Sequence, residues 1–247
     1  MKKTANGNPT GEILNNKGQH IGHMFDRIAR RYDFLNHLLS MGIDRYWRRI
    51  TIRELSGTSP EHVLDVATGT GDLAIALSRK LGCKVTGVDV SVNMMAYGEK
   101  KIARRKLTGK ITFVKGVAEA LAFDANTFDA STVAFGVRNF GDLEKGLKEI
   151  LRVLKPGCPL AVLEFSMPRN RLLRGCYTFY LFHILPLAGK IISGDRQAYA
   201  YLPASIKTFP KGDDFAHIMQ QVGYEDVWFR PLSYGIVTLY LGIKKIK

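Results

Sequence analysis

The chain has 247 residues, of which 46% are hydrophobic and 23% charged, with a formal net charge of +14, which is the composition of a basic, soluble globular protein. Its three widely spaced cysteines, Cys83, Cys158 and Cys176, argue against a disulfide framework or a thiolate metal site and favour a reducing compartment. The first ten residues lack the apolar core of a signal peptide, so we expect a cytoplasmic protein.

The first two thirds of the chain alternate short β-rich runs with helical stretches. A flexible tail over residues 1–19 should precede a helical cap over residues 20–55, which has apolar residues at helical spacing. We then expect parallel strands over 62–66, 84–90, 110–116, 127–135 and 159–165, with helices over 71–81, 91–105 and 142–154 between them. This alternation is typical of a parallel sheet that is covered by helices on both faces.

The end of the chain follows a different pattern. A helix over 213–222 precedes two apolar runs, 225–232 and 235–245, which are only two residues apart. Strands that close together must pair antiparallel, because a parallel crossover needs about a dozen residues. The sequence therefore predicts an α/β fold with a mostly parallel seven-stranded sheet and one antiparallel strand. We expect one domain over residues 20–247, with an insertion over residues 166–210.

The stretch VLDVATGTGDLAIAL, residues 63–77, predicts a ligand site after the first strand. Gly69 and Gly71 stand where a helix begins, so a ligand can approach the backbone closely. Asp89 ends the next strand, where a carboxylate can accept hydrogen bonds from both ribose hydroxyls of a nucleoside. Nicotinamide or flavin dinucleotides and S-adenosylmethionine (SAM) both use this arrangement, and GTGDLA (69–74) also matches the dinucleotide pattern.

Three features favour SAM over a dinucleotide. Asp65 precedes the glycines, and its carboxylate would repel a pyrophosphate but suits a cationic amino-acid group. KGVAEAL (115–121) follows the third strand, where an adenine-contacting segment is expected for a methyl donor. VLKPG (153–157) leads into the fifth strand with a turn common in methyltransferases. A dinucleotide-dependent oxidoreductase is the alternative.

Two long stretches of the chain resemble the signatures of the UbiE/MenG quinone C-methyltransferases. These are YDFLNHLLSMGIDRYWRR (32–49) and RVLKPGCPLAVLEFS (152–166), and FGVRNF (135–140) and GDRQAYAYLPASIKTFP (194–210) are similar to further stretches of that family. The resemblance implies a Rossmann-like class I SAM-dependent methyltransferase that methylates the ring carbon of a polyprenylated demethylquinol. In this family the step ends menaquinone synthesis. In some members it also serves ubiquinone synthesis, so a 2-methoxy-6-polyprenyl-benzoquinol is the alternative acceptor.

The resemblance also implies residues that hold the donor. By position these are Thr70 in the glycine turn, Asp89, and Val117-Ala118 after the third strand. Val117 stands where many members have Asn, so we expect only a backbone or apolar contact to adenine there.

Arg138 and Asn139, just past the fourth strand, are expected to meet the substrate ring. Arg138 would stabilise the quinolate and Asn139 would fix a ring oxygen, although a surface salt bridge is the alternative for Arg138. Tyr32 begins the first signature and is expected to close over the site. His20, His23, His37 and His183 are candidate bases, but a lone histidine is more often structural. No cluster of residues has metal-ligand spacing, so we expect a metal-independent reaction.

The insertion points to a membrane surface. Its segment CYTFYLFHILPLAG, residues 176–189, is apolar but shorter than the roughly 20 residues that span a bilayer. Residues 1–57 carry +5 and residues 166–211 carry +6 of the net charge. An apolar wall between basic residues predicts peripheral contact with the inner face of the cytoplasmic membrane and entry of an isoprenoid tail. A lid helix packed on its own domain is the alternative.

The basic charge also raises an RNA methyltransferase as a rival function. RNA binding favours aromatic residues interleaved with basic ones, and the sequence shows no such pattern, so we expect no nucleic acid partner. The sequence leaves a homo-oligomer open.

Overall fold

The computed structural model describes residues 22–27, 29, 33, 36–37, 40–185, 187 and 196–246. Its first named elements are α2 (Asp44–Ser56), β1 (His62–Val66), α3 (Asp72–Leu81), β2 (Lys84–Asp89), α4 (Val92–Arg104) and β3 (Ile111–Lys115). The middle of the chain forms β4 (Ala130–Ala134), η1 (Val137–Asn139), α5 (Leu143–Val153), β5 (Pro159–Phe165), α6 (Arg171–Phe179) and η2 (Tyr180–Ile184). The last elements are α8 (Arg196–Thr208), α9 (Asp213–Val222), β6 (Tyr224–Leu232), η3 (Ser233–Gly235) and β7 (Val237–Lys244).

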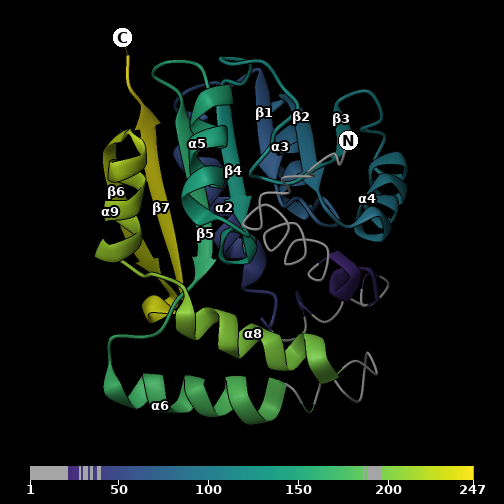
Figure 1. Ribbon diagram of the computed structural model, residues 1–247. Helices are drawn as coiled ribbons and strands as arrows, with labels where there is room; N and C mark the ends of the chain where they lie inside the picture. Colours follow the sequence, from purple (N-terminus) through teal and green to yellow (C-terminus); the bar gives the residue numbers. More distant parts are fainter. Residues whose placement is uncertain are drawn as a thin grey trace, which may run out of the picture.

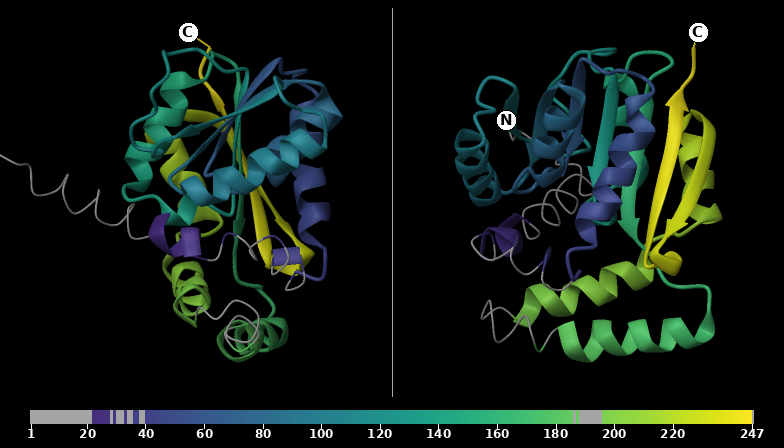
Figure 2. Two further views of the ribbon diagram at one scale, coloured as in Figure 1. Left: turned by 90° about the vertical axis from the view of Figure 1, so that its right-hand side faces the viewer. Right: turned by 180° about the vertical axis from the view of Figure 1, so that it is seen from behind.

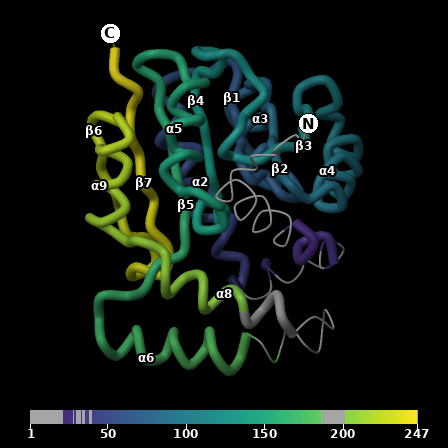
Figure 3. Tube along the Cα trace, in the orientation of Figure 1, coloured from purple at the N-terminus to yellow at the C-terminus, as the bar shows by residue number. Residues whose placement is uncertain are grey.

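Seven strands form one sheet in the order β3-β2-β1-β4-β5-β7-β6 (Figure 1). Strands β1 to β5 pair in parallel, whereas β7 runs antiparallel to both β5 and β6. Figure 3 shows β7 running beside β5, although α6, η2, α8, α9, β6 and η3 lie between them in the chain. The predicted mostly parallel sheet with one antiparallel strand is confirmed, because the short η3 turn leaves β6 and β7 no other way to pair.

Helices cover both faces of the sheet and build a separate core on each side. On one face, α2, α3 and α4 bury apolar side chains such as Trp47, Leu77 and Ile102 against the strands. On the other face, α5 and α9 do the same with Leu147, Ile150 and Phe215. The strands alternate their side chains between these two cores, so nearly every residue of β1 and β5 is buried.

Side-chain caps fix two of the predicted helix starts. The hydroxyl of Ser91 accepts a hydrogen bond from Met94 N at 3.1 Å, and the carboxylate of Asp142 accepts one from Lys145 N at 3.0 Å. One predicted strand is shorter than expected, because β4 begins at Ala130 rather than at residue 127. The carboxylate of Asp129 accepts the backbone N–H groups of Glu61 and His62, which ties this stretch to the start of β1 instead.

The insertion lies beneath the edge of the sheet at which the parallel strands end. In Figures 1 and 2, α6 and α8 run side by side below the carboxyl ends of these strands, apart from the two helical layers. A third apolar cluster joins this region to the rest of the protein through Met24, Met94, Leu181, Leu185 and Ile206. Within the described residues, none of the helices has the length and apolar character needed to cross a membrane.

Three glycines enclose the ring of Phe113 on β3. A Cβ atom at Gly71 or Gly87 would lie 2.5 or 2.7 Å from this ring, and one at Gly98 would lie closer still. Gly71 also has a φ of +76°, a conformation that a side chain disfavours. Packing therefore explains one of the glycines in the turn after β1, because a side chain at position 71 would overlap Phe113.

We expect Gly98→Ala to lower the thermal stability of the protein. Alanine normally stabilises a helix interior relative to glycine by about 0.5–1 kcal/mol, but here its methyl group would overlap Phe113, and overpacking costs about 1–3 kcal/mol. Gly175→Ala in α6 is the matched control, because nothing lies within 4 Å of a Cβ at that position. Differential scanning calorimetry should show a lower Tm for Gly98→Ala and an unchanged or higher Tm for Gly175→Ala. Equal Tm shifts would contradict the packing argument.

Candidate functional site

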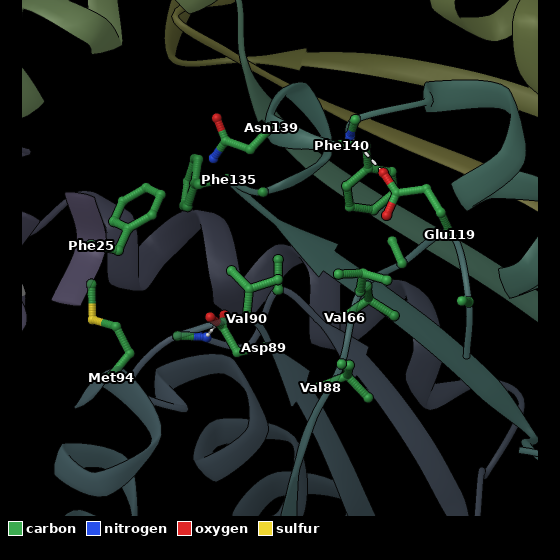
Figure 4. Close-up of a pocket in the computed structure, with 18 of the residues that line it drawn as sticks. Phe25, Val66, Val88, Asp89, Val90, Met94, Glu119, Phe135, Asn139 and Phe140 are labelled. Atoms are coloured by element: carbon green, nitrogen blue, oxygen red, sulfur yellow. Dashed lines mark hydrogen bonds between the residues drawn. The ribbon is translucent and has the colours of Figure 1, made fainter. Parts of the chain in front are cut away.

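Two cavities open at the carboxyl ends of the parallel strands. Cavity 1, of about 230 Å³, is bounded by the loops that follow β1, β2, β3 and β4, and its lining includes Gly69, Asp89, Val117, Ala118 and Asn139 (Figure 4). Cavity 2, of about 260 Å³, lies between the N-terminal cap, the end of β5 and the insertion, and its lining includes Trp47, Arg138, Phe165, Tyr177 and Tyr201. The edge of the sheet where parallel strands end is where ligands bind in open α/β folds.

Asp89 presents a carboxylate to cavity 1 from the end of β2. Its Oδ2 accepts a hydrogen bond from Gly69 N at 2.7 Å, and its Oδ1 accepts one from Ser91 N at 2.8 Å. Burial raises the pKa of Asp89, and these backbone N–H groups partly offset the rise because they stabilise the charged form. The two bonds hold the carboxylate in one orientation, with its remaining lone pairs available to neighbouring hydroxyl groups.

The other walls of cavity 1 suit a flat, largely apolar group. Val66, Val88, Ala118 and Phe140 line it with aliphatic and aromatic carbon. Glu119 closes one end, where its carboxylate accepts the backbone N–H groups of Gly141 and Asp142 (Figure 4). A carboxylate for ribose hydroxyls beside an apolar slot for a purine fits a nucleoside, and therefore fits the nucleoside part of SAM.

Arg138 projects into cavity 2 as half of a buried ion pair. Its Nη1 lies 2.7 Å from Oε1 of Glu164, and the two side chains are 5% and 0% exposed. Nη1 also donates to the carbonyl of Phe135, and Nε donates to Oγ of Ser205 at 3.2 Å. Within the described part of the chain, Nη2 of Arg138 has no hydrogen-bond partner. The salt bridge predicted as the alternative for Arg138 is present, but it is buried at the wall of cavity 2 and does not lie on the surface.

Phe25 and Phe135 are the two described residues that line both cavities. Figure 4 shows their rings near one another at one end of cavity 1, close to Asn139. Phe135 has a φ of +59°, which is strained for an aromatic residue and costs about 1–3 kcal/mol. Its ring lies 4.5 Å from the ring of Phe165, centroid to centroid. The surroundings hold Phe135 in this conformation at the boundary where the two cavities meet.

Comparison with known proteins identifies the family. A sequence model of the ubiE/COQ5 methyltransferase family matches residues 13–244. The chain belongs to this family. It is 44% identical over 230 residues to a Porphyromonas gingivalis protein named demethylmenaquinone methyltransferase, covering 92% of this chain and 94% of that protein. It is 45% identical over 236 residues to the Geobacter sulfurreducens ubiquinone/menaquinone biosynthesis C-methyltransferase UbiE, covering 95% and 92%. The chain is therefore a methyltransferase.

Solved structures share the fold at low sequence identity. The crystal structure of the [4+2]-cyclase SpnF superposes with a TM-score of 0.65 at 18% identity, covering 93% of this chain and 97% of that one. A SAM-dependent methyltransferase from Thermotoga maritima superposes with a TM-score of 0.60 at 21% identity, covering 90% and 99%. These likenesses support the Rossmann-like methyltransferase fold and carry no information about the substrate.

Three of the residues predicted to bind the donor in this methyltransferase lie outside the lining of cavity 1. Asp65 is buried beneath the glycine turn, where its two oxygens accept the hydroxyl groups of Thr132 and Thr68, each at 2.6 Å. Burial raises the pKa of Asp65 to about 6, and the two hydroxyl donors partly offset the rise. Thr70 hydrogen-bonds to Asp33 and Lys101. Direct contacts of Asp65, Thr70 and Gly71 with the donor therefore stay predictions.

Ion pairs join the N-terminal cap to the glycine turn. Nζ of Lys101 lies 2.6 Å from carboxylate oxygens of both Asp33 and Asp72. His37 lies between Asp44, at 2.7 Å from Nδ1, and Asp72, at 3.4 Å from Nε2. The contacts of Lys101 explain why Thr70 faces the cap, and they were invisible in the sequence because Lys101 lies 29 to 68 residues from its partners.

The remaining predicted residues fall outside both cavities or outside the described residues. Tyr32 and His20 lie outside the described residues, so their predicted roles stay predictions. His23 and His183 are exposed, and neither they nor His37 lines a cavity. No group of three His, Cys, Asp or Glu side chains in the described ranges is placed to hold a metal ion.

We expect Asp89→Ala to weaken SAM binding by 10- to 100-fold. This is the effect of losing charge-assisted hydrogen bonds worth about 1.5–3 kcal/mol. Asp129→Ala is the matched control, since Asp129 also accepts two backbone N–H groups at a strand end but lines neither cavity. Isothermal titration calorimetry of both variants with SAM measures the difference. A SAM affinity in Asp89→Ala equal to that of Asp129→Ala would remove Asp89 from the donor site.

Proposed function

We propose that this methyltransferase transfers the methyl group of SAM to the ring carbon of a polyprenylated demethylquinol, converting demethylmenaquinol to menaquinol. The observation that carries the proposal is the junction of two unlike cavities at Phe25 and Phe135. Cavity 1 offers the ribose-binding carboxylate and the apolar slot, and cavity 2 offers a wall of aromatic and aliphatic side chains. The relatives named for demethylmenaquinone and for ubiquinone/menaquinone biosynthesis support this class of acceptor.

The residues around cavity 1 would hold the donor. When bound, SAM supplies a methyl group on a positively charged sulfur, which a carbon nucleophile can attack. Asp89 would accept the ribose hydroxyls, and Val117 and Ala118 would contact the adenine without a side-chain hydrogen bond. The boundary formed by Phe25 and Phe135 would face the reacting methyl group and limit the access of water.

Cavity 2 would hold the quinol ring and the start of its tail. Phe165, Tyr177, Tyr180, Leu181 and Ile206 give it the apolar surface that a polyprenyl naphthoquinol requires. Arg138 adds a cation beside this surface, and its Nη2, which has no partner among the described residues, would donate to a quinol oxygen. The ring carbon that will receive the methyl group becomes nucleophilic as negative charge builds on that oxygen. Over the whole reaction the substrate loses one proton.

The role of Arg138 would be electrostatic. An arginine stays protonated, so it stabilises the developing quinolate and does not remove the proton itself. Glu164 holds the guanidinium in place and is itself fully used, because it accepts hydrogen bonds from Arg138 and from Phe165 N. A preorganised donor of this kind is typically worth about 2.7–4 kcal/mol in the transition state.

Product analysis tests the proposed reaction. The protein is incubated with methyl-labelled SAM and either demethylmenaquinol or 2-methoxy-6-polyprenyl-benzoquinol, and the labelled product is identified by mass spectrometry. We expect labelled menaquinol from the first substrate. Label appearing only in the benzoquinol product would favour ubiquinone synthesis, and label in neither would overturn the proposal.

Arg138→Lys is the variant to include in this assay. It keeps a cation but loses the planar guanidinium, so kcat should fall by about 10- to 100-fold while SAM affinity stays within twofold. Arg138→Ala is less informative, because it would leave the buried carboxylate of Glu164 with backbone N–H donors but without a cation, and losing one partner of a buried ion pair costs about 3–5 kcal/mol of stability. A kcat equal to that of the wild type in Arg138→Lys would remove the guanidinium from the reaction.

We further propose that the enzyme works as a peripheral protein on the inner face of the cytoplasmic membrane. The outer side of α6 and η2 exposes large apolar side chains, with Leu172, Phe179 and Phe182 78%, 59% and 45% exposed. Arg171 and Arg174 are exposed on the same helix, and the described residues from 166 to 187 include no acidic side chain. Each basic residue near an anionic surface adds roughly 1 kcal/mol of attraction.

Replacing Phe179 and Phe182 together by Ser should lower binding to vesicles of phosphatidylglycerol and phosphatidylcholine by about tenfold or more. The two half-exposed rings would lose about 1.4–3 kcal/mol of transfer free energy between them. Ile246→Ser is the control, because Ile246 is even more exposed, at 74%, but stands next to the C-terminus, which Figure 1 shows at the end of the molecule away from α6. Vesicle sedimentation measures binding. Unchanged sedimentation of the double variant would favour a lid helix that only packs on its own domain.

A further inference from the structure

Helix α8 makes two hydrogen bonds to adjacent residues of η1. The hydroxyl of Tyr201 donates to Oδ1 of Asn139 at 2.9 Å, and Oγ of Ser205 accepts from Nε of Arg138 at 3.2 Å. Tyr201 and Ser205 are four residues apart, so they lie on the same face of the helix. The insertion therefore contacts both residues that the sequence placed at the substrate ring, across more than 60 positions of the chain.

The hydrogen bonds from α8 use only Oδ1 of Asn139 and Nε of Arg138, so other polar atoms of these two side chains are not engaged by the helix. Ser205 uses its own proton on the carbonyl of Leu202, at 2.9 Å, so its oxygen is left to accept from Arg138. Glu164 and Phe135 take Nη1 of Arg138. Across the described ranges, neither Nη2 of Arg138 nor Nδ2 of Asn139 has a hydrogen-bond partner.

The bond from Tyr201 also sets the direction of the Asn139 amide. Because Oδ1 accepts from the tyrosine hydroxyl, the amide nitrogen must point the other way. Figure 4 shows this nitrogen on the side of Phe135 and the oxygen on the opposite side. Asn139 lines cavity 1, whereas Arg138 and Tyr201 line cavity 2, so the pair lies where the two cavities meet.

We propose that Tyr201 and Ser205 are positioning residues, which orient Asn139 and Arg138 so that their free N–H groups donate to the quinol oxygen beside the reacting carbon. The proposal rests on the proposed function and extends it, since it makes the alignment of these donors depend on α8. Cavity 2 is walled partly by this same helix. Helix α8 must therefore pack against η1 for two reasons. It encloses the acceptor, and it orients the N–H groups of Asn139 and Arg138 toward the acceptor.

A double-mutant cycle between Tyr201→Phe and Asn139→Ala tests the proposal. Tyr201→Phe alone should lower kcat for demethylmenaquinol about five- to tenfold and weaken the binding of the product menaquinol, measured with S-adenosylhomocysteine present. In the Asn139→Ala background the same substitution should change both quantities less than twofold, because the tyrosine acts through the amide. SAM affinity should stay within twofold throughout. A second cycle pairs Ser205→Ala with Arg138→Lys in the same way.

Tyr224→Phe is the matched control for the loss of one buried hydroxyl. The hydroxyl of Tyr224 donates to the carbonyl of Leu147 at 3.0 Å, and neither residue lines a cavity, so this variant should keep the kcat of the wild type. Equal effects of Tyr201→Phe in both backgrounds, or no effect in either, would overturn the proposal.

If the proposed function is wrong, the wild-type protein will methylate neither quinol. The coupling between Tyr201 and Asn139 would then be measured by urea unfolding of the wild type, the two single variants and the double variant. Additive unfolding free energies in that cycle would also overturn the inference, since the Tyr201–Asn139 bond would then contribute nothing.

Discussion

A guanidinium and a carboxylate, both removed from water, face one another where β4 and β5 end. The pair is costly to bury, and its cost is offset because the Glu164 carboxylate accepts three hydrogen bonds while the Arg138 guanidinium donates to three acceptors. These contacts tie together three segments that are distant in the chain: η1, the end of β5, and α8. The wall of cavity 2, the position of Asn139 and the strained conformation of Phe135 all depend on this one ion pair.

The boundary between the cavities is built differently, from aromatic rings. Phe135 stacks on Phe165, and Trp47 lies 6.0 Å from Phe135 between ring centroids, so the wall is rigid on the side of the sheet. Arg48 and Arg138 lie over these rings, at 6.0 Å from the centroid of Phe135 and 5.6 Å from that of Phe165. Phe25 closes the boundary from the cap. Water reaching the junction would have to displace apolar carbon on both sides.

The sequence predicts the sheet well, because its signals are local. Strand runs, the caps at Ser91 and Asp142 and the short gap before β7 each lie within a few residues of the feature they determine. The positions of Asp89 and Gly69 at cavity 1 were also predictable, since Asp89 ends β2 and Gly69 lies in the turn after β1. The glycine turn shows the limit of this reasoning. Gly71 was predicted only as a ligand-binding residue, and the structure shows that it also makes room for Phe113, a contact that becomes visible only when β3 is placed beside the turn.

The residues that sequence reasoning missed are those defined by distant partners. Glu164 appears within an apolar strand and looks unremarkable until β5 is set next to η1. Tyr201 lies in a stretch similar to the family, yet nothing local indicates that it faces Asn139. Phe25 carries no motif at all. The local signal nearest to Phe135 was Gly136, and the structure explains this glycine, because a Cβ there would overlap Ala67.

The two cavities draw on different parts of the chain, and this has a consequence for how such an enzyme could change its acceptor. Apart from Phe25, the lining of cavity 1 comes from residues 66 to 145, which belong to the sheet and its loops. Cavity 2 is lined largely by described residues within 24–48, 177–206 and 233–236, which lie around the sheet rather than in it. Substitutions at these positions can reshape cavity 2, the proposed acceptor site, while the strand ends around cavity 1 stay intact. One scaffold could in this way supply methyl groups to acceptors of quite different size, with the insertion as the part that diverges.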